Sequence, residues 1–171
     1  MNFIIKLSKF KNSIIEEEYD SIMIIMNRLI KWAYFISYQK SMRAEETAYL
    51  FEWHVITNHK TSTEIIMNWD IRFRTTFWKT LMNSREVKTK MSTSEHAQTD
   101  KQIKRLNQIL EQYLQCYVNY QQNNWIKWLS RAQFAYNDSI HSSTEVTSFF
   151  AKYEKEMTAQ QTALTIESKN D

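Results

Sequence analysis

The sequence predicts a single α/β domain in which a mixed sheet carries helices on its faces. Three short apolar runs follow one another near the N-terminus, and strand-like runs then alternate with amphipathic segments. No linker or internal repeat interrupts this order. The chain has 171 residues, and its 43% hydrophobic and 24% charged content is typical of one globular domain.

The predicted strands are short runs of apolar or β-branched residues. Residues 1–7, 21–26 and 32–38 suggest a three-stranded meander, and residues 64–67 and 87–91 add two strands that alternate with helices. We therefore expect a five-stranded mixed sheet flanked by helices.

Helical spacing of apolar residues predicts helices over residues 44–56, 75–83, 99–121 and 125–136. Thr99 is the expected N-cap of the third helix, because Gln102 follows three residues later in a capping-box pattern. The residues expected to face the core are Ala44, Ala48, Phe51 and Val55; Phe77, Trp78, Leu81 and Met82; Ile103, Leu106, Leu110, Leu114 and Tyr117; and Trp125, Trp128, Leu129, Ala132 and Tyr136.

Composition excludes several classes of protein. The single cysteine rules out an internal disulfide, and the four scattered histidines give no Cys/His pairing at zinc spacing. The apolar run at residues 21–36 contains Arg28 and Lys31, so it indicates two strands rather than a membrane span. Residues 1–7 are too few for the apolar part of a signal peptide. A net charge of +3 permits contact with nucleic acid but does not argue for it.

The chain contains no glycine and no proline. Average usage would give roughly twelve and roughly eight in a chain of this length. Because glycine supplies the positive φ angles of turns and helix C-caps at least cost, a mixed domain without it should carry backbone strain.

Two long segments resemble the integrase core of gypsy-type LTR retrotransposon polyproteins. The first reads HAQTDKQIKRLNQILEQYLQCYVNYQQNNWIKWLSRAQFAYNDSIHSSTEVTSFFAKYEKEM, and the second reads EIIMNWDIRFRTTFWKTLM. The stretch YDSIMIIMNRLIKWAYFI is similar to the family's second and third strands. The resemblance runs from Met1 to about Met157 and implies an RNase H-like core, with an integrase catalytic core-like domain over residues 1–157. Residues 158–171 are polar and aperiodic, so we expect a disordered tail there.

The resemblance also implies a catalytic site. The family transfers phosphoryl groups on DNA with two Mg²⁺ or Mn²⁺ ions, which two Asp and one Glu hold. The aligned positions here are Asn2, Asn68 and Lys104. The 35 residues between Asn68 and Lys104 match the family's spacing, so this alignment requires no gap.

None of these three side chains can replace a carboxylate as a ligand of a divalent metal ion. Hard divalent cations require anionic oxygen ligands. A unit positive charge about 4 Å from a divalent ion costs roughly 8 kcal/mol at an effective dielectric constant near 20. Asp70 and Asp100 are the nearest acids in sequence, but Asp100 is better explained as an ion pair with Lys104 one helical turn away. We therefore expect no intact catalytic residue, no bound metal or other cofactor, and no activity.

Many differences between this sequence and the family pattern are of the same kind at the level of the codon. Asp becomes Asn, Glu becomes Lys, and glycine becomes Lys60, Lys101, Glu145 or Glu154, as G-to-A transitions would produce. Eighteen Ile against four Val agree with this bias. Our hypothesis is that a host repeat-silencing process hypermutated this gene copy and that the copy then decayed.

The resemblance implies DNA as a weak partner, a homodimer and a nuclear location, with no membrane partner. It assigns nucleic-acid contacts to His96, Gln98, Lys101 and Arg105. Charge alone favours the simpler interpretation of a solvated helix face. Three hypotheses remain: an inactive integrase-core relic, a non-catalytic nucleic-acid-binding or interaction module retained by the host, and an active nuclease or transferase that uses other ligands.

Overall fold

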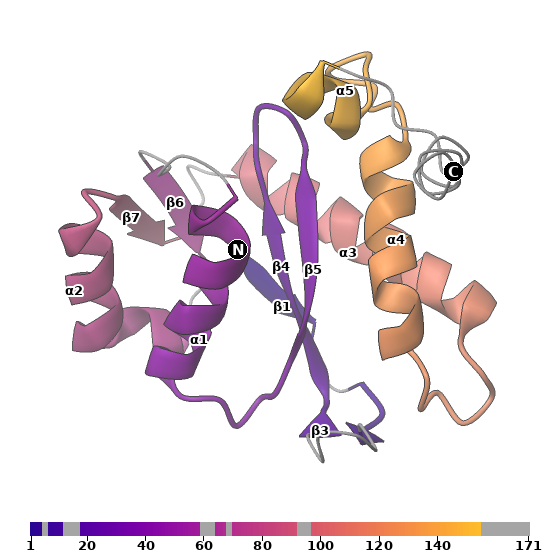
Figure 1. Cartoon of the computed structure of the whole chain (residues 1–171), viewed down its shortest axis with the longest axis horizontal. Coiled ribbons are helices and arrows are strands. Elements are labelled where there is room, and N and C mark those ends of the chain that lie inside the picture. The colour runs from indigo at the N-terminus through magenta and orange to yellow at the C-terminus, as the bar shows by residue number, and fades with distance from the viewer. Residues whose placement is uncertain (5–6, 12–17, 59–63, 68–69, 92–96, 155–171) are drawn as a thin grey trace, which may run out of the picture.

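The computed structural model describes residues 1–4, 7–11, 18–58, 64–67, 70–91 and 97–154 (Figure 1). The expected tail, residues 158–171, lies outside this part of the chain. No helix within the described ranges is long and apolar enough to cross a membrane. The elements are β1 (Asn2–Ile4), β2 (Phe10–Lys11), β3 (Glu18–Tyr19), β4 (Ser21–Met26), β5 (Ala33–Tyr38), α1 (Ala44–Phe51), η1 (Glu52–Ile56), β6 (Glu64–Met67), η2 (Ile71–Arg74), α2 (Thr76–Ser84), β7 (Lys88–Met91), α3 (Ala97–Tyr117), α4 (Ile126–Asp138) and α5 (Ser148–Tyr153).

The five predicted strands are present as β1, β4, β5, β6 and β7, but they form two sheets rather than one among the described residues. Strands β1, β4 and β5 form an antiparallel sheet in that order, and β6 and β7 pair in parallel. A hydrogen bond of 2.7 Å from the Met1 backbone nitrogen to the Ile66 carbonyl oxygen joins β6 to the residue before β1. The expectation of one continuous five-stranded sheet is therefore wrong in this respect. Among the described residues, this hydrogen bond links β1 to β6 without strand pairing, so the two sheets are not continuous.

Both faces of the antiparallel sheet are covered. Alternate residues of β4 and β5 point to opposite faces, as the period of a strand requires. Met23 and Tyr34 belong to a core cluster with α1, α2 and β6, whereas Ile24 and Phe35 belong to a second cluster with α3 and α4. Figure 1 shows the sheet between these two groups of helices. This two-sided burial explains why β4 is an almost unbroken apolar run.

The predicted helices occur with small shifts of their ends, and α1 continues into the π-helix η1. Most of the residues expected in the core are buried, but Phe77 and Tyr117 are 44% and 49% exposed. Helix α3 begins at Ala97, so Thr99 is its third residue and the predicted N-cap is wrong. The hairpin of β2 and β3 and the helix α5 have no counterpart among the predicted elements.

Backbone strain is present at two of the four positions where the family resemblance implies glycine. Glu145 and Glu154 have φ angles of 58° and 54°. Lys101 lies inside α3 and is not among the residues with positive φ, and Lys60 lies outside the described residues. Three further residues have positive φ, namely Lys31, Glu86 and Gln122. A left-handed conformation costs a residue with a Cβ roughly 1–2 kcal/mol.

Candidate functional site

The candidate site lies where β1, β6 and α3 approach one another. The hydrogen bond between Met1 and Ile66 places the start of β1 beside β6, and β6 ends at Met67, directly before Asn68. The backbone of Asn2 lies opposite Ile24 in the sheet, while the Asn2 side chain and all of Asn68 lie outside the described residues. Lys104 is exposed on α3.

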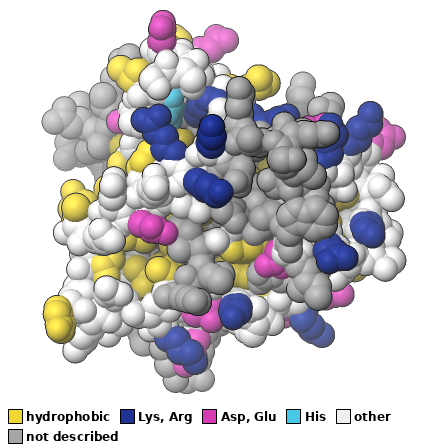
Figure 2. Space-filling view, turned by 180° about the vertical axis from the view of Figure 1, so that it is seen from behind, with side chains coloured by type: hydrophobic (Ala, Val, Ile, Leu, Met, Phe, Trp, Pro, Cys, Tyr) yellow, Lys and Arg dark blue, Asp and Glu magenta, His cyan; other side chains and the backbone are white. Residues whose placement is uncertain are grey.

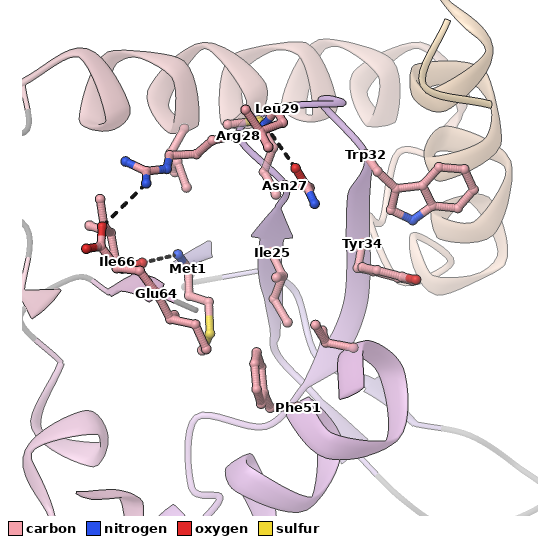
Figure 3. A pocket seen from close by; sticks show the side chains of 14 residues that line it. Met1, Ile25, Asn27, Arg28, Leu29, Trp32, Tyr34, Phe51, Glu64 and Ile66 are labelled. Carbon is pink, nitrogen blue, oxygen red and sulfur yellow. Dashed lines mark hydrogen bonds and ion pairs between the residues drawn. The ribbon is translucent and has the colours of Figure 1, made fainter. Parts of the chain in front are cut away.

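A cavity of about 280 Å³ adjoins this region (Figure 3). Met1, Ile66 and Ile103 all line it. These residues are neighbours, within two positions in the sequence, of Asn2, Asn68 and Lys104 respectively. Most of the remaining lining is apolar: Ile25, Leu29, Trp32, Phe51, Val55 and Ile65. The chain therefore folds so that three segments distant in sequence meet around one largely apolar space.

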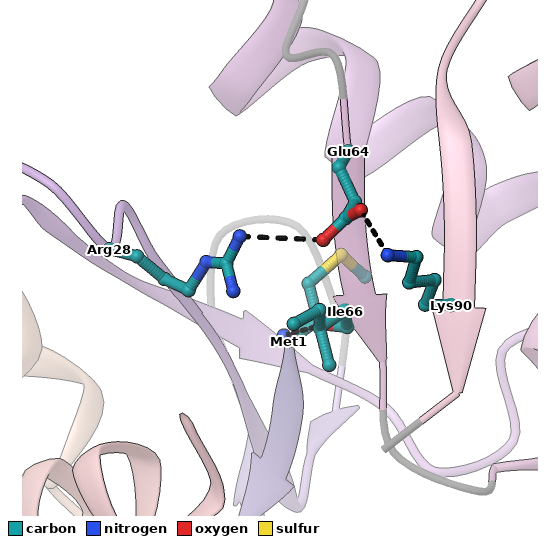
Figure 4. Close-up of polar contacts among 5 residues, drawn as sticks. All are labelled: Met1, Arg28, Glu64, Ile66 and Lys90. Atoms are coloured by element: carbon teal, nitrogen blue, oxygen red, sulfur yellow. Dashed lines mark hydrogen bonds and ion pairs between the residues drawn. The ribbon is translucent and has the colours of Figure 1, made fainter. Parts of the chain in front are cut away.

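The one carboxylate in the described lining is already engaged. Figure 4 shows Glu64 between two cations, with its oxygens 3.4 Å from Arg28 Nη2 and 2.6 Å from Lys90 Nζ. The Glu64 side chain is only 23% exposed, so these ion pairs are partly shielded from solvent. Sequence reasoning missed this cluster, because 36 residues separate Arg28 from Glu64 and no local pattern connects them.

The residues present do not fit a pair of divalent metal ions. Such ions require several anionic oxygens in defined geometry. No group of three His, Cys, Asp or Glu side chains that could hold a metal ion occurs in the part of the chain that the structure describes. Amide and ammonium groups at the aligned positions Asn2, Asn68 and Lys104 supply no anionic oxygen.

The expected nucleic-acid contacts lie on or near the start of α3. Lys101 and Arg105 are exposed and lie one helical turn apart on the same face. Gln98 is in the first turn of α3, but its side chain is not described, and His96 lies outside the described residues. Figure 2 shows Lys and Arg side chains in both the upper and the lower part of the face opposite to the view of Figure 1.

Comparison with solved structures decides the fold. The HTLV-2 integrase catalytic core domain in complex with magnesium, in its trimeric form, superposes with a TM-score of 0.58 and 12% identity over 88% of this chain and 95% of that chain. A chain of the simian T-cell lymphotropic virus intasome in complex with PP2A regulatory subunit B56 gamma superposes with a TM-score of 0.65 and 12% identity over 91% of this chain and 55% of that chain. This chain has the fold of an integrase catalytic core.

The sequence of this chain is similar to those of transposon polyproteins. The Tf2-3 and Tf2-4 transposon polyproteins of Schizosaccharomyces pombe (strain 972 / ATCC 24843) are each 34% identical to it over 131 residues, which is 77% of this chain. The chain spans 10% of the length of these polyproteins. No protein-family model matches the chain. The expected integrase-core fold and the similarity to transposon polyproteins are thus confirmed.

Proposed function

We propose that this chain is the catalytic-core region of a gypsy-type LTR retrotransposon integrase that has lost its metal-binding acids and has no catalytic activity. The integrase-core fold and the similarity to transposon polyproteins support the family assignment. The observation that carries the proposal is the cavity that Met1, Ile66 and Ile103 share. It brings the neighbours of Asn2, Asn68 and Lys104 together, and those positions carry two amides and one ammonium.

The purified protein should neither cut nor join DNA in Mg²⁺ or Mn²⁺. The triple variant Asn2→Asp, Asn68→Asp and Lys104→Glu should gain Mn²⁺ binding, which isothermal titration calorimetry would measure. A matched control carries Lys101→Glu in place of Lys104→Glu, because both lysines are exposed on α3. The control should not bind Mn²⁺. Turnover by the unmodified chain that a chelator removes would overturn the proposed inactivity.

DNA remains the proposed partner, through the exposed cations of α3. Lys101, Lys104 and Arg105 are exposed within two turns of this helix. Each phosphate contact that is lost should reduce the slope of log affinity against log salt concentration by about one. Fluorescence anisotropy with Lys101→Gln and Arg105→Gln would test this, and unchanged affinity would contradict it. By analogy with the dimeric and trimeric HTLV-2 structures we also propose self-association and, for a protein acting on chromosomal DNA, a nuclear location.

A non-catalytic module retained by the host is the second candidate. The exposed cations of α3 favour it, because nucleic-acid binding does not require the lost acids. Purifying selection at Lys101 and Arg105 across relatives would support retention, whereas unconstrained decay would support a relic.

A further inference from the structure

A second, larger cavity lies between α3, α4 and the turn that joins β4 to β5. Its volume is about 550 Å³, within the range of pockets that hold small molecules. Met26 lines both cavities, but the other residues of this lining differ from those beside the candidate catalytic positions.

The floor of this cavity is apolar and aromatic. Phe35, Leu106, Leu110 and Ala132 line it and are almost fully buried. The ring of Tyr136 lies 6.0 Å from that of Phe35 and 4.7 Å from that of His141, measured between centroids. The three rings are tilted to one another, and aromatic side chains are frequent partners of nucleic-acid bases.

The described lining carries the positive charges of Lys31 and Arg105 and adds the imidazole of His141. None of its described residues is Asp or Glu. Lys31 Nζ donates to the Arg28 carbonyl oxygen at 2.6 Å and contacts Gln102 Oε1 at 3.5 Å, which holds it beside α3. His141 Nε2 is buried and has no hydrogen-bond partner in the described part of the chain. Ser142 and Ser143 add hydroxyl donors to the same lining, whereas the Ser139 hydroxyl donates to the Tyr136 carbonyl oxygen at 2.7 Å.

We propose that this cavity binds a nucleoside monophosphate group, with the base against the aromatic floor and the phosphate near Lys31, Arg105 and His141. Guanidinium, ammonium and hydroxyl donors together suit a phosphate dianion. The same chemistry is present in a free mononucleotide and in the 5′-phosphorylated end of a single strand. The proposal shares Arg105 with the proposed DNA-binding face, but it requires neither catalysis nor a metal ion.

The test is calorimetric titration of the full chain with dAMP in the presence of EDTA. We expect dAMP to bind at least tenfold more tightly than either deoxyadenosine or inorganic phosphate alone. Arg105→Gln should weaken dAMP binding about tenfold. Lys127→Gln is the matched control, because Lys127 is exposed on α4, which also borders the cavity, and does not itself line the cavity. It should leave dAMP binding unchanged.

A second variant tests the location without altering charge. Ala135 is exposed and lines the cavity, so Ala135→Trp should block it and abolish binding while the thermal unfolding transition is retained. A 5′-phosphorylated oligonucleotide that binds more tightly than dAMP, and that Ala135→Trp also excludes, would identify a strand end as the ligand. Equal affinity would identify the free nucleotide. Equal losses in Arg105→Gln and Lys127→Gln, or unchanged binding in Ala135→Trp, would overturn the proposal.

Discussion

Asn137 on α4 makes two hydrogen bonds to the backbone of one residue, Ala33. Its Oδ1 accepts from the Ala33 nitrogen at 2.8 Å, and its Nδ2 donates to the Ala33 carbonyl oxygen at 3.0 Å. One turn earlier, Gln133 Oε1 accepts from the Phe35 nitrogen at 2.8 Å. Four helical residues rise about 6.0 Å and two strand residues about 6.7 Å, so the spacing of the two side chains matches that of the two amides.

Asn137→Asp should lower the free energy of unfolding by about 2–3 kcal/mol, because it removes the buried donor to Ala33 and places a carboxylate there. Urea denaturation would measure the change. Asn83→Asp is the matched control, since Asn83 is exposed on α2 and should change stability by less than about 0.5 kcal/mol. Similar small losses in both variants would show that the two hydrogen bonds contribute little.

Glycine should stabilise the strained turns and destabilise the helix. Glu154→Gly, at the left-handed C-cap of α5, and Glu145→Gly should each raise the free energy of unfolding by about 1 kcal/mol. Lys101→Gly should lower it by about 1 kcal/mol, because Lys101 lies inside α3. Thermal unfolding of the three variants would measure these opposite signs. A gain at all three positions would contradict the conformations described.

Stability should fall as the pH drops below about 6.5, the ordinary histidine pKa. Burial lowers the pKa of His141, and the positive charges of Lys31 and Arg105 lower it further, although a backbone hydrogen bond with Tyr136 acts in the opposite direction. The unfolded chain therefore binds more protons than the folded chain below pH 6.5. His141→Gln should flatten the pH dependence of urea denaturation in this window. Burial also lowers the pKa of His54, so a slope should remain until His54→Gln is added.

Glu64→Gln should lower stability by about 1 kcal/mol, because it weakens the pairs with both Arg28 and Lys90. The loss should shrink in about 1 M salt, where surface charges are screened. Glu18→Gln is the control: Glu18 pairs with Lys9, and both side chains are more than half exposed. Denaturant titration at two salt concentrations would compare the variants. An equal, salt-independent loss in both would rule out the ion pairs as the cause.

Local sequence patterns predicted most of the helices and strands but could not predict how these elements pack together. The apolar run of β4 and the apolar spacing of α1 are visible in short stretches of sequence, so residues 21–26 and 44–51 were identified. The short pair of β2 with β3 has two residues a strand, too few for a periodic signal. The first turn of α3 precedes its apolar stripe, which explains why its start was placed too late.

Some features of the candidate site were likewise predictable from the sequence, and others were not. The positions Asn2, Asn68 and Lys104 came from resemblance, and they stay predictions. The contacts of Lys31 with Gln102 and of Arg28 with Glu64 span 71 and 36 residues, and only the fold brings them together. His141 gave no signal in the sequence, because its surroundings come from α3 and from the turn before β5.

The side-chain amides of Asn137 and Gln133 on α4 also affect whether a strand of a second molecule can pair with β5. Strand β5 is the last in its sheet, and Asn137 and Gln133 occupy the backbone groups of Ala33 and Phe35 that a strand from another molecule would need. Strand β7, outermost beside β6, carries the exposed Lys88 and Lys90. Charged and capped edges resist edge-to-edge aggregation. This chain, which builds its turns without glycine, therefore has two features that prevent its sheets from extending into a second copy.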